Sequence, residues 1–117
     1  MKRDIDLIKE ILTEIEESNA PSDIIEIDIP DRSQEEISYH IMLIYQAGLL
    51  EAEDVSGTNS YKWIPISLTW QGHEFLDAVR NDTVWKKLKS KLKEQGGNLP
   101  FHVVKELVTK FSNELHL

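Results

Sequence analysis

The side chains with the clearest binding chemistry fall in one short stretch of the sequence, residues 32–42. They are Arg32, Gln34, Ser38, Tyr39 and Met42. Arginine and glutamine pair with guanine and adenine edges in the major groove, so a helix presenting this set could read duplex DNA. Glu35 and Glu36 would then lie near phosphates and be repelled by them. The same two carboxylates would stabilise the positive N-terminal end of their own helix. Base reading and ordinary helix stabilisation both fit this stretch.

A second group of candidate contacts is basic. Five lysines follow Trp85 within nine residues, and apolar residues recur between them at helical spacing: Lys86, Lys87, Lys89, Lys91 and Lys93, with Leu88 and Leu92. Lys62 adds one cation in a predicted hairpin. Three readings fit the lysine run: a solvated face whose stems cover the core, a phosphate contact, or a docking face for the acidic half of another copy.

No pattern of catalytic, metal-binding or cofactor-binding residues is present in the sequence. The chain has no cysteine, and none of its four histidines has a second histidine at ligand spacing. We expect His40 and His73 to lie satisfied at the edge of the core. There is also no glycine-rich phosphate loop and no nucleophile motif, so the sequence predicts a protein that is not an enzyme and needs no cofactor.

The net charge of −8 is divided unevenly along the chain. Residues 1–60 contain four Lys or Arg against fifteen Asp or Glu, and residues 61–117 contain nine against six. Such a charge asymmetry indicates what kinds of partner the protein can bind, and says little about its fold. It is compatible with duplex DNA, with another protein, or with a homodimer in which acidic and basic halves pair.

The 117 residues suffice for one compact domain with a short appendage. Charged residues interrupt the apolar pattern of the N-terminal stretch MKRDIDLIKEIL, which therefore has the features of neither a signal peptide nor a membrane span. The missing cysteines fit a reducing compartment. We expect a cytoplasmic protein without a membrane partner.

Periodicity and capping residues predict the order helix, strand, helix, two strands, then three helices. Asp4 is expected to cap the first helix, Asp31 or Ser33 the second, Thr69 the third, and Asp82 or Thr83 the fourth. The alternating isoleucines of residues 24–29 predict a half-buried strand. The resulting class is α+β, with a small three-stranded antiparallel sheet over residues 1–80 and a C-terminal helical hairpin packed on it over residues 81–117.

The stretch LTWQGHEFLDAVRNDTVW, residues 68–85, is interpreted as a structural seam. Gly72 would let the third helix approach the sheet closely, and Trp70 and Phe75 would bury large areas there. Pro65 cannot donate to a strand ladder, so it should lie at an edge or a bulge of the hairpin.

Two sets of residues resemble known families. Gly48-Leu49-Leu50 and Leu68-Thr69-Trp70-Gln71-Gly72 resemble the helix-to-wing and wing-to-helix steps of winged-helix regulators, over about residues 4–80. That resemblance implies DNA binding. One departure counts against it, because residues 17–33 leave no room for the first helix of a helix-turn-helix.

Nearly the whole chain is similar to an uncharacterised family of bacterial and prophage proteins, a domain of unknown function. The similarity rests on MKRD, on Tyr39-His40, on QAGL at residues 46–49, and on LTWxGHEFLDxxRxDTVW at residues 68–85. It implies no activity and no site residues.

Two functional hypotheses follow. The first is a winged-helix-like DNA-binding regulator that contacts DNA through residues 32–42, Lys62 and the lysine run. The alternative is an acidic protein-interaction module, which docks a partner or mimics nucleic-acid charge without binding DNA.

Overall fold

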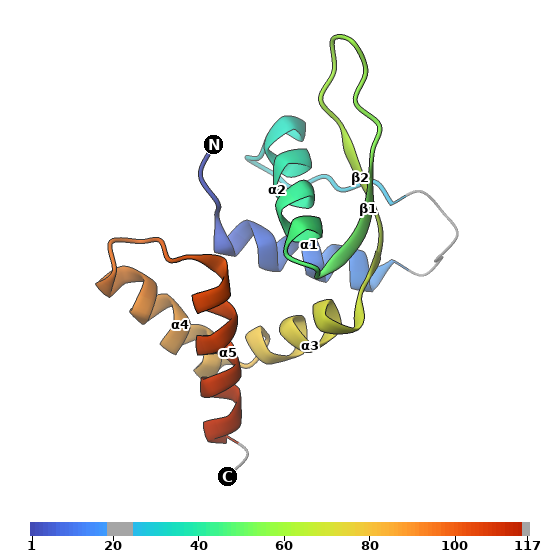
Figure 1. The fold of residues 1–117 in the computed structure, drawn as a ribbon. Coiled ribbons are helices and arrows are strands. Elements are labelled where there is room, and N and C mark those ends of the chain that lie inside the picture. Colours follow the sequence, from blue (N-terminus) through green and yellow to red (C-terminus); the bar gives the residue numbers. More distant parts are fainter. Residues whose placement is uncertain (19–24, 116–117) are drawn as a thin grey trace. The chain divides into compact units, whose positions relative to one another are not determined.

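The computed structural model describes residues 1–18 and 25–115, and these ranges contain five helices and two strands (Figure 1). The elements are α1 (Ile5–Glu17), α2 (Gln34–Gln46), β1 (Leu50–Asp54), β2 (Trp63–Leu68), α3 (Trp70–Val79), α4 (Asp82–Glu94) and α5 (Phe101–Leu115). The predicted α+β class is confirmed. The chain forms two compact units, a first unit of Met1–His73 and a second unit of Glu74–Leu117, so α3 begins in one and ends in the other.

The helices of the first unit begin and end at residues with local hydrogen-bonding reasons to be there. The Asp4 carboxylate accepts from the N–H groups of Asp6 and Leu7, and the Ser33 hydroxyl accepts from the Glu36 N–H at 3.0 Å. Gly48 ends α2 with φ +81°, a left-handed conformation that costs glycine little. The caps at Asp4 and Ser33 follow the sequence-based prediction.

The wing, our name for the β1–β2 hairpin at residues 50–68, is an antiparallel pair (Figure 1). Its register shifts after Glu51, so that Glu51 pairs with Ser67 and Ala52 pairs with Pro65. The extra residue, Ile66, makes a bulge beside the proline, as the missing N–H of Pro65 predicted. Helices α1 and α2 both pack against β2.

The predicted third strand is absent from the described residues. Residues 25–29 form no ladder, and Ile24 lies outside the described ranges. Ile27 and Ile29 are nevertheless buried, while the carbonyl of Ile27 accepts a side-chain hydrogen bond from Gln34 at 3.1 Å. The alternating isoleucines therefore mark burial on one side of an irregular segment, and not a strand. A turn with left-handed Asp31, closed by Arg32 N–H to Ile29 O, then leads into α2.

Buried aliphatic side chains of α1 and α2 form the core of the first unit, together with the two leucines that follow Gly48. They are Leu7, Ile8, Ile11, Leu12, Ile15, Ile37, Ile41, Ile44, Leu49 and Leu50. The apolar spacing of Ile37, Ile41, Ile44 and Tyr45 predicts a buried stripe on α2, and this is correct except at its end, because Tyr45 is 41% exposed. His40, expected at the edge of the core, is completely buried within it.

The second unit contains a helical hairpin in which α4 and α5 pack against each other. Asn81 caps α4 by accepting from the N–H groups of Thr83 and Val84, so the predicted cap at Asp82 or Thr83 was misplaced by one or two residues. Asparagine has a similar preference for this position. Gly96 and Gly97, both with positive φ, follow the end of the helix.

Gly72 brings the first turn of α3 against the backbone that leaves α2. A Cβ at this position would overlap the carbonyl oxygen of Leu49. Thr69 fastens the same turn, because its N–H donates to Leu49 O at 3.1 Å and its hydroxyl donates to Gly48 O at 2.7 Å. The predicted close approach is confirmed.

The seam prediction holds for Phe75 and fails for Trp70. Phe75 is buried, with its ring 5.6 Å from that of Phe101, but Trp70 is 77% exposed. The phase of the helix explains this difference. Once Gly72, Phe75 and Val79 define the inward face, Trp70 lies two residues, or about 200°, from Gly72 on a 3.6-residue helix and points outward.

Replacing Gly72 with alanine should destabilise the protein by about 2 to 3 kcal/mol, because the new methyl group forces α3 away from the Leu49 carbonyl. This loss outweighs the higher helix propensity of alanine. Urea unfolding followed by circular dichroism measures the change. Exposed Gln71→Ala, in the same turn, is the control and should be nearly neutral; equal stability of the two variants would contradict the close approach.

Candidate functional site

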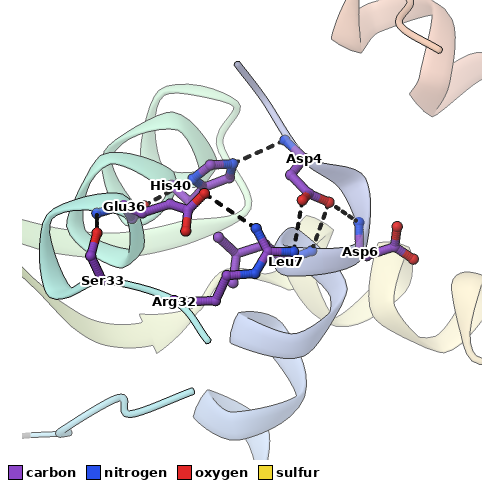
Figure 2. Close-up of polar contacts among 7 residues, drawn as sticks. All are labelled: Asp4, Asp6, Leu7, Arg32, Ser33, Glu36 and His40. Carbon is purple, nitrogen blue, oxygen red and sulfur yellow. Dashed lines mark hydrogen bonds and ion pairs between the residues drawn. The ribbon is translucent and has the colours of Figure 1, made fainter. Parts of the chain in front are cut away.

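A polar cluster joins the N-terminal ends of α1 and α2 (Figure 2). Arg32 bridges two carboxylates, with Nη2 at 2.8 Å from Asp4 Oδ2 and Nη1 at 3.2 Å from Glu36 Oε2. His40 lies beside them and is fully buried. The cluster contains an imidazole, a guanidinium and two carboxylates, which are the groups from which acid–base sites are built.

The hydrogen bonds of His40 nevertheless assign it a structural role. Its Nδ1 lies 2.9 Å from the carbonyl oxygen of Glu36, which can only accept, so Nδ1 carries the proton. Its Nε2 then accepts from the backbone N–H of Asp4, also at 2.9 Å. Both ring nitrogens of the neutral imidazole are used, and neither has a lone pair directed at solvent or at a metal ion.

The cluster also alters the acidity of its charged members. Burial alone would raise the pKa of the Asp4 carboxyl, but hydrogen bonds from Arg32 and from the N–H groups of Leu7 and Asp6 together prevail. The pKa of Asp4 therefore lies below its ordinary value. The same hydrogen bond to Asp4, supported by the charges of both carboxylates, raises the pKa of Arg32.

The wing packs on the face of α2 that carries most of the predicted DNA-contacting residues. Lys62 Nζ donates to Gln34 Oε1 at 3.2 Å, and the backbone N–H of Trp63 donates to the hydroxyl of Ser38 at 3.2 Å. Ser38 is 1% exposed. These side chains hold the wing to the helix and leave Ser38 no surface for a nucleic acid.

The contact between the wing and α2 continues toward the C-terminal end of α2. The phenol of Tyr61 donates to Met42 Sδ at 3.4 Å, and the rings of Tyr45 and Trp63 lie 5.7 Å apart. Burial and the negative charge of Asp54 raise the pKa of Tyr61, so this phenol keeps the proton that it donates. The residues at positions 34, 38, 42 and 45 follow one helical stripe, and all four contact the wing.

The remaining predicted contacts have different surroundings. The half-buried ring of Tyr39 packs edge-on against His40 at 5.8 Å. Lys87 forms an ion pair with Glu114 at 3.1 Å, and Lys89 lies 5.5 Å from the centre of the Trp85 ring. Exposed Lys86 and Lys93 form no ion pair within the described part of the chain, and are therefore available to a partner.

Sequence reasoning missed the cluster because its partners are distant along the chain. Asp4 and Arg32 are 28 residues apart, and Asp4 and His40 are 36 apart. The one local signal was the spacing of Arg32 and Glu36, which places opposite charges on one face of a helical turn.

Residues 1–18 and 25–115 contain no group of three or more His, Asp or Glu side chains arranged to hold a metal ion. Over the same ranges, no helix is long and apolar enough to cross a membrane.

Replacing Asp4 with asparagine should lower the free energy of unfolding by roughly 1 kcal/mol at pH 7, because the amide still caps α1 but loses the ion pair of a partly exposed couple. Since the folded-state pKa lies below the unfolded-state value, this contribution is complete above the unfolded-state pKa and disappears as pH falls through the folded-state pKa.

Urea titrations of the wild type and Asp4→Asn between pH 7 and pH 2 therefore give curves that converge below about pH 4. Glu10→Gln, an exposed change on the same helix, controls for the general effect of charge. A difference between wild type and Asp4→Asn that persists undiminished at pH 2 would contradict the assignment.

Replacing Ser38 with alanine should destabilise the fold by about 1 to 2 kcal/mol, because the N–H of Trp63 loses its acceptor where the wing packs on α2. Exposed Gln46→Ala on the same helix is the control. Thermal unfolding measures both. If Ser38→Ala leaves stability unchanged, the hydroxyl does not hold the wing.

Comparison with known proteins confirms the family expected from the sequence. Residues 2–98 match the model of the family described as "Hypothetical protein (DUF2513)". An uncharacterised protein of Haemophilus influenzae is 39% identical over 116 residues, which cover 98% of each chain. No solved structure matches the chain. The matched range includes the polar cluster, the wing and the lysines of α4, and the chain therefore belongs to the DUF2513 family.

Proposed function

We propose that this protein is a protein-interaction module whose acidic first unit docks on a basic surface of its partner. The charge of that unit carries the proposal: Met1–His73 contains five Lys or Arg against fifteen Asp or Glu, a net charge of −10. Such a surface repels phosphates and attracts cationic proteins over the distance of a Debye length.

The geometry of α2 supports docking over base reading. To reach base edges, Gln34 would have to give up its hydrogen bonds to Ile27 and Lys62. Ser38 would have to leave its buried position between α2 and the wing. Arg32 is already shared between two carboxylates. Each lost bond costs about 0.5 to 1.5 kcal/mol, which a base contact would first have to recover.

A winged-helix-like scaffold remains part of this proposal. The order α1, α2 and wing supports it, but residues 25–33 include no helix that could serve as the first helix of a helix-turn-helix. We therefore assign the scaffold to protein recognition. Its chemistry is that of a binding surface, because His40 has no nitrogen available for proton transfer.

Fluorescence anisotropy of the labelled full chain tests the proposal with two probes, a mixed-sequence DNA duplex and poly-L-lysine, each at low and at physiological salt. We expect no duplex binding at either salt. Poly-L-lysine should bind, and its affinity should fall as salt rises. Duplex binding at low salt that decreases in the Gln34→Ala and Lys62→Ala variants would overturn the proposal in favour of a DNA-binding regulator.

The matched variants neutralise three carboxylates in each unit. Changing Glu10, Glu14 and Glu17 to glutamine should weaken poly-L-lysine binding severalfold. The equivalent changes in the second unit, Glu74→Gln, Asp82→Asn and Glu106→Gln, should have little effect. Equal effects of the two sets would contradict docking by the first unit.

A further inference from the structure

One large aromatic side chain of the first unit projects into solvent from a rigid base. Trp70 is 77% exposed, although the turn that carries it is fixed to the end of α2 by Thr69 and Gly72. Tryptophan is among the residues most enriched at the energetic centres of protein interfaces. A rigidly held, exposed tryptophan loses little conformational freedom when a partner covers it.

The same turn lies beside the C-terminal end of α1. His73 Nδ1, on the turn that Trp70 begins, is 3.7 Å from Glu16 Oε2. The last turn of α1 therefore lies next to the turn that carries the tryptophan. We use the name α1–Trp70 surface for Trp70 and the exposed face of α1, both of which belong to the first unit.

Three carboxylates occupy that face of α1 without a cation to balance them. Glu10, Glu14 and Glu17 follow the spacing i, i+4 and i+7, all are exposed, and none forms an ion pair within the described residues. Like charges four apart destabilise a helix, and α1 has no basic residue in its last turn to complement the negative end of the helix dipole. Cations placed along this stripe would relieve both effects.

The second unit carries a stripe of the opposite charge. Lys86, Lys89 and Lys93 lie on one face of α4 at i, i+3 and i+7, beside the half-buried Trp85. Lys86 and Lys93 form no ion pair within the described residues, and Lys89 covers the Trp85 ring. This face of α4 therefore presents the exposed ammonium groups of Lys86 and Lys93 to an acidic partner, with Lys89 and the Trp85 ring between them.

The two stripes match when the helices run antiparallel. Read backwards, the α1 carboxylates are separated by three and then four residues, as are the α4 lysines read forwards. Each stripe spans about 10.5 Å at a rise of 1.5 Å per residue. Glu17 would then meet Lys86, Glu14 would meet Lys89, and Glu10 would meet Lys93. Trp70, at the Glu17 end, would lie near Trp85.

We propose that the α1–Trp70 surface of one copy binds the lysine face of α4 in a second copy of this chain. This inference rests on the proposed function and names its partner. Exposed lysine–carboxylate pairs are individually weak and screened by salt, so Trp70 has to supply much of the affinity. The association should be weak and reversible, and should be strongest at low ionic strength.

Sedimentation equilibrium of the full chain over a range of concentrations tests the inference, at roughly 50 mM and 500 mM salt. We expect concentration-dependent association at low salt that weakens at least tenfold at high salt. Trp70→Ala, and the triple change of Lys86, Lys89 and Lys93 to glutamine, should each weaken it at least tenfold. The control triple Glu26→Gln, Glu51→Gln and Glu53→Gln should associate like the wild type. Circular dichroism confirms that each variant is folded.

A charge exchange isolates the pairing itself. One variant carries lysine at positions 10, 14 and 17, and the other carries glutamate at positions 86, 89 and 93. Each should be monomeric alone, because its two stripes have the same sign, and an equimolar mixture should associate. Failure of the mixture to associate would overturn the inference, as would association of either variant alone at wild-type strength.

The remaining outcomes separate this inference from the proposed function. A chain that stays monomeric at low salt but binds poly-L-lysine through Glu10, Glu14 and Glu17 refutes self-association and leaves the proposed function standing. Association that is indifferent to Trp70→Ala also refutes the α1–Trp70 surface. Duplex binding through Gln34 and Lys62 refutes the proposed function, whatever the state of association.

Discussion

The first unit depends on how the start of α1 is joined to α2. The backbone N–H of Asp4 donates to the buried imidazole of His40, while its carboxylate caps α1 and holds Arg32. One residue thus fixes where α1 begins and which turn of α2 it touches. The isoleucine faces of both helices can then pack in a single arrangement, because a shift of either helix would leave a buried polar group without its partner.

This arrangement determines what the surface offers to other molecules. With α2 held in place, its stripe from Gln34 to Tyr45 receives the wing, and its polar side chains satisfy hydrogen bonds inside the unit. The outward surface of the unit is rich in carboxylates, and its most exposed aromatic side chain is Trp70. The binding chemistry expected in residues 32–42 is thus used mainly for internal structure, and recognition is assigned to α1 and the start of α3.

Local physics determined which parts of this fold could be predicted from sequence. The helices, their caps at Asp4 and Ser33 and the wing were predictable, because periodicity and capping act within a few residues. The buried state of His40 and the Asp4–Arg32 pair were not, since their partners lie 36 and 28 residues away. The strand predicted at residues 24–29 was wrong over residues 25–29, because Ile27 and Ile29 are buried without forming a ladder. The predicted burial of Trp70 was wrong because the direction of its side chain depends on which residues of α3 face inward.

The junction of α2 and α3 has a consequence for anion binding. The carbonyl end of α2, at Gly48 and Leu49, faces the amide end of α3, where the Thr69 N–H, the Thr69 hydroxyl and the Gly72 N–H all have acceptors. The two helix dipoles meet with opposite ends together and compensate each other. A free helix N-terminus commonly cradles a phosphate. Here the residues that end α2 take both Thr69 donors and the Thr69 hydroxyl takes the Gly72 N–H, so these three groups cannot bind a phosphate while the junction is intact.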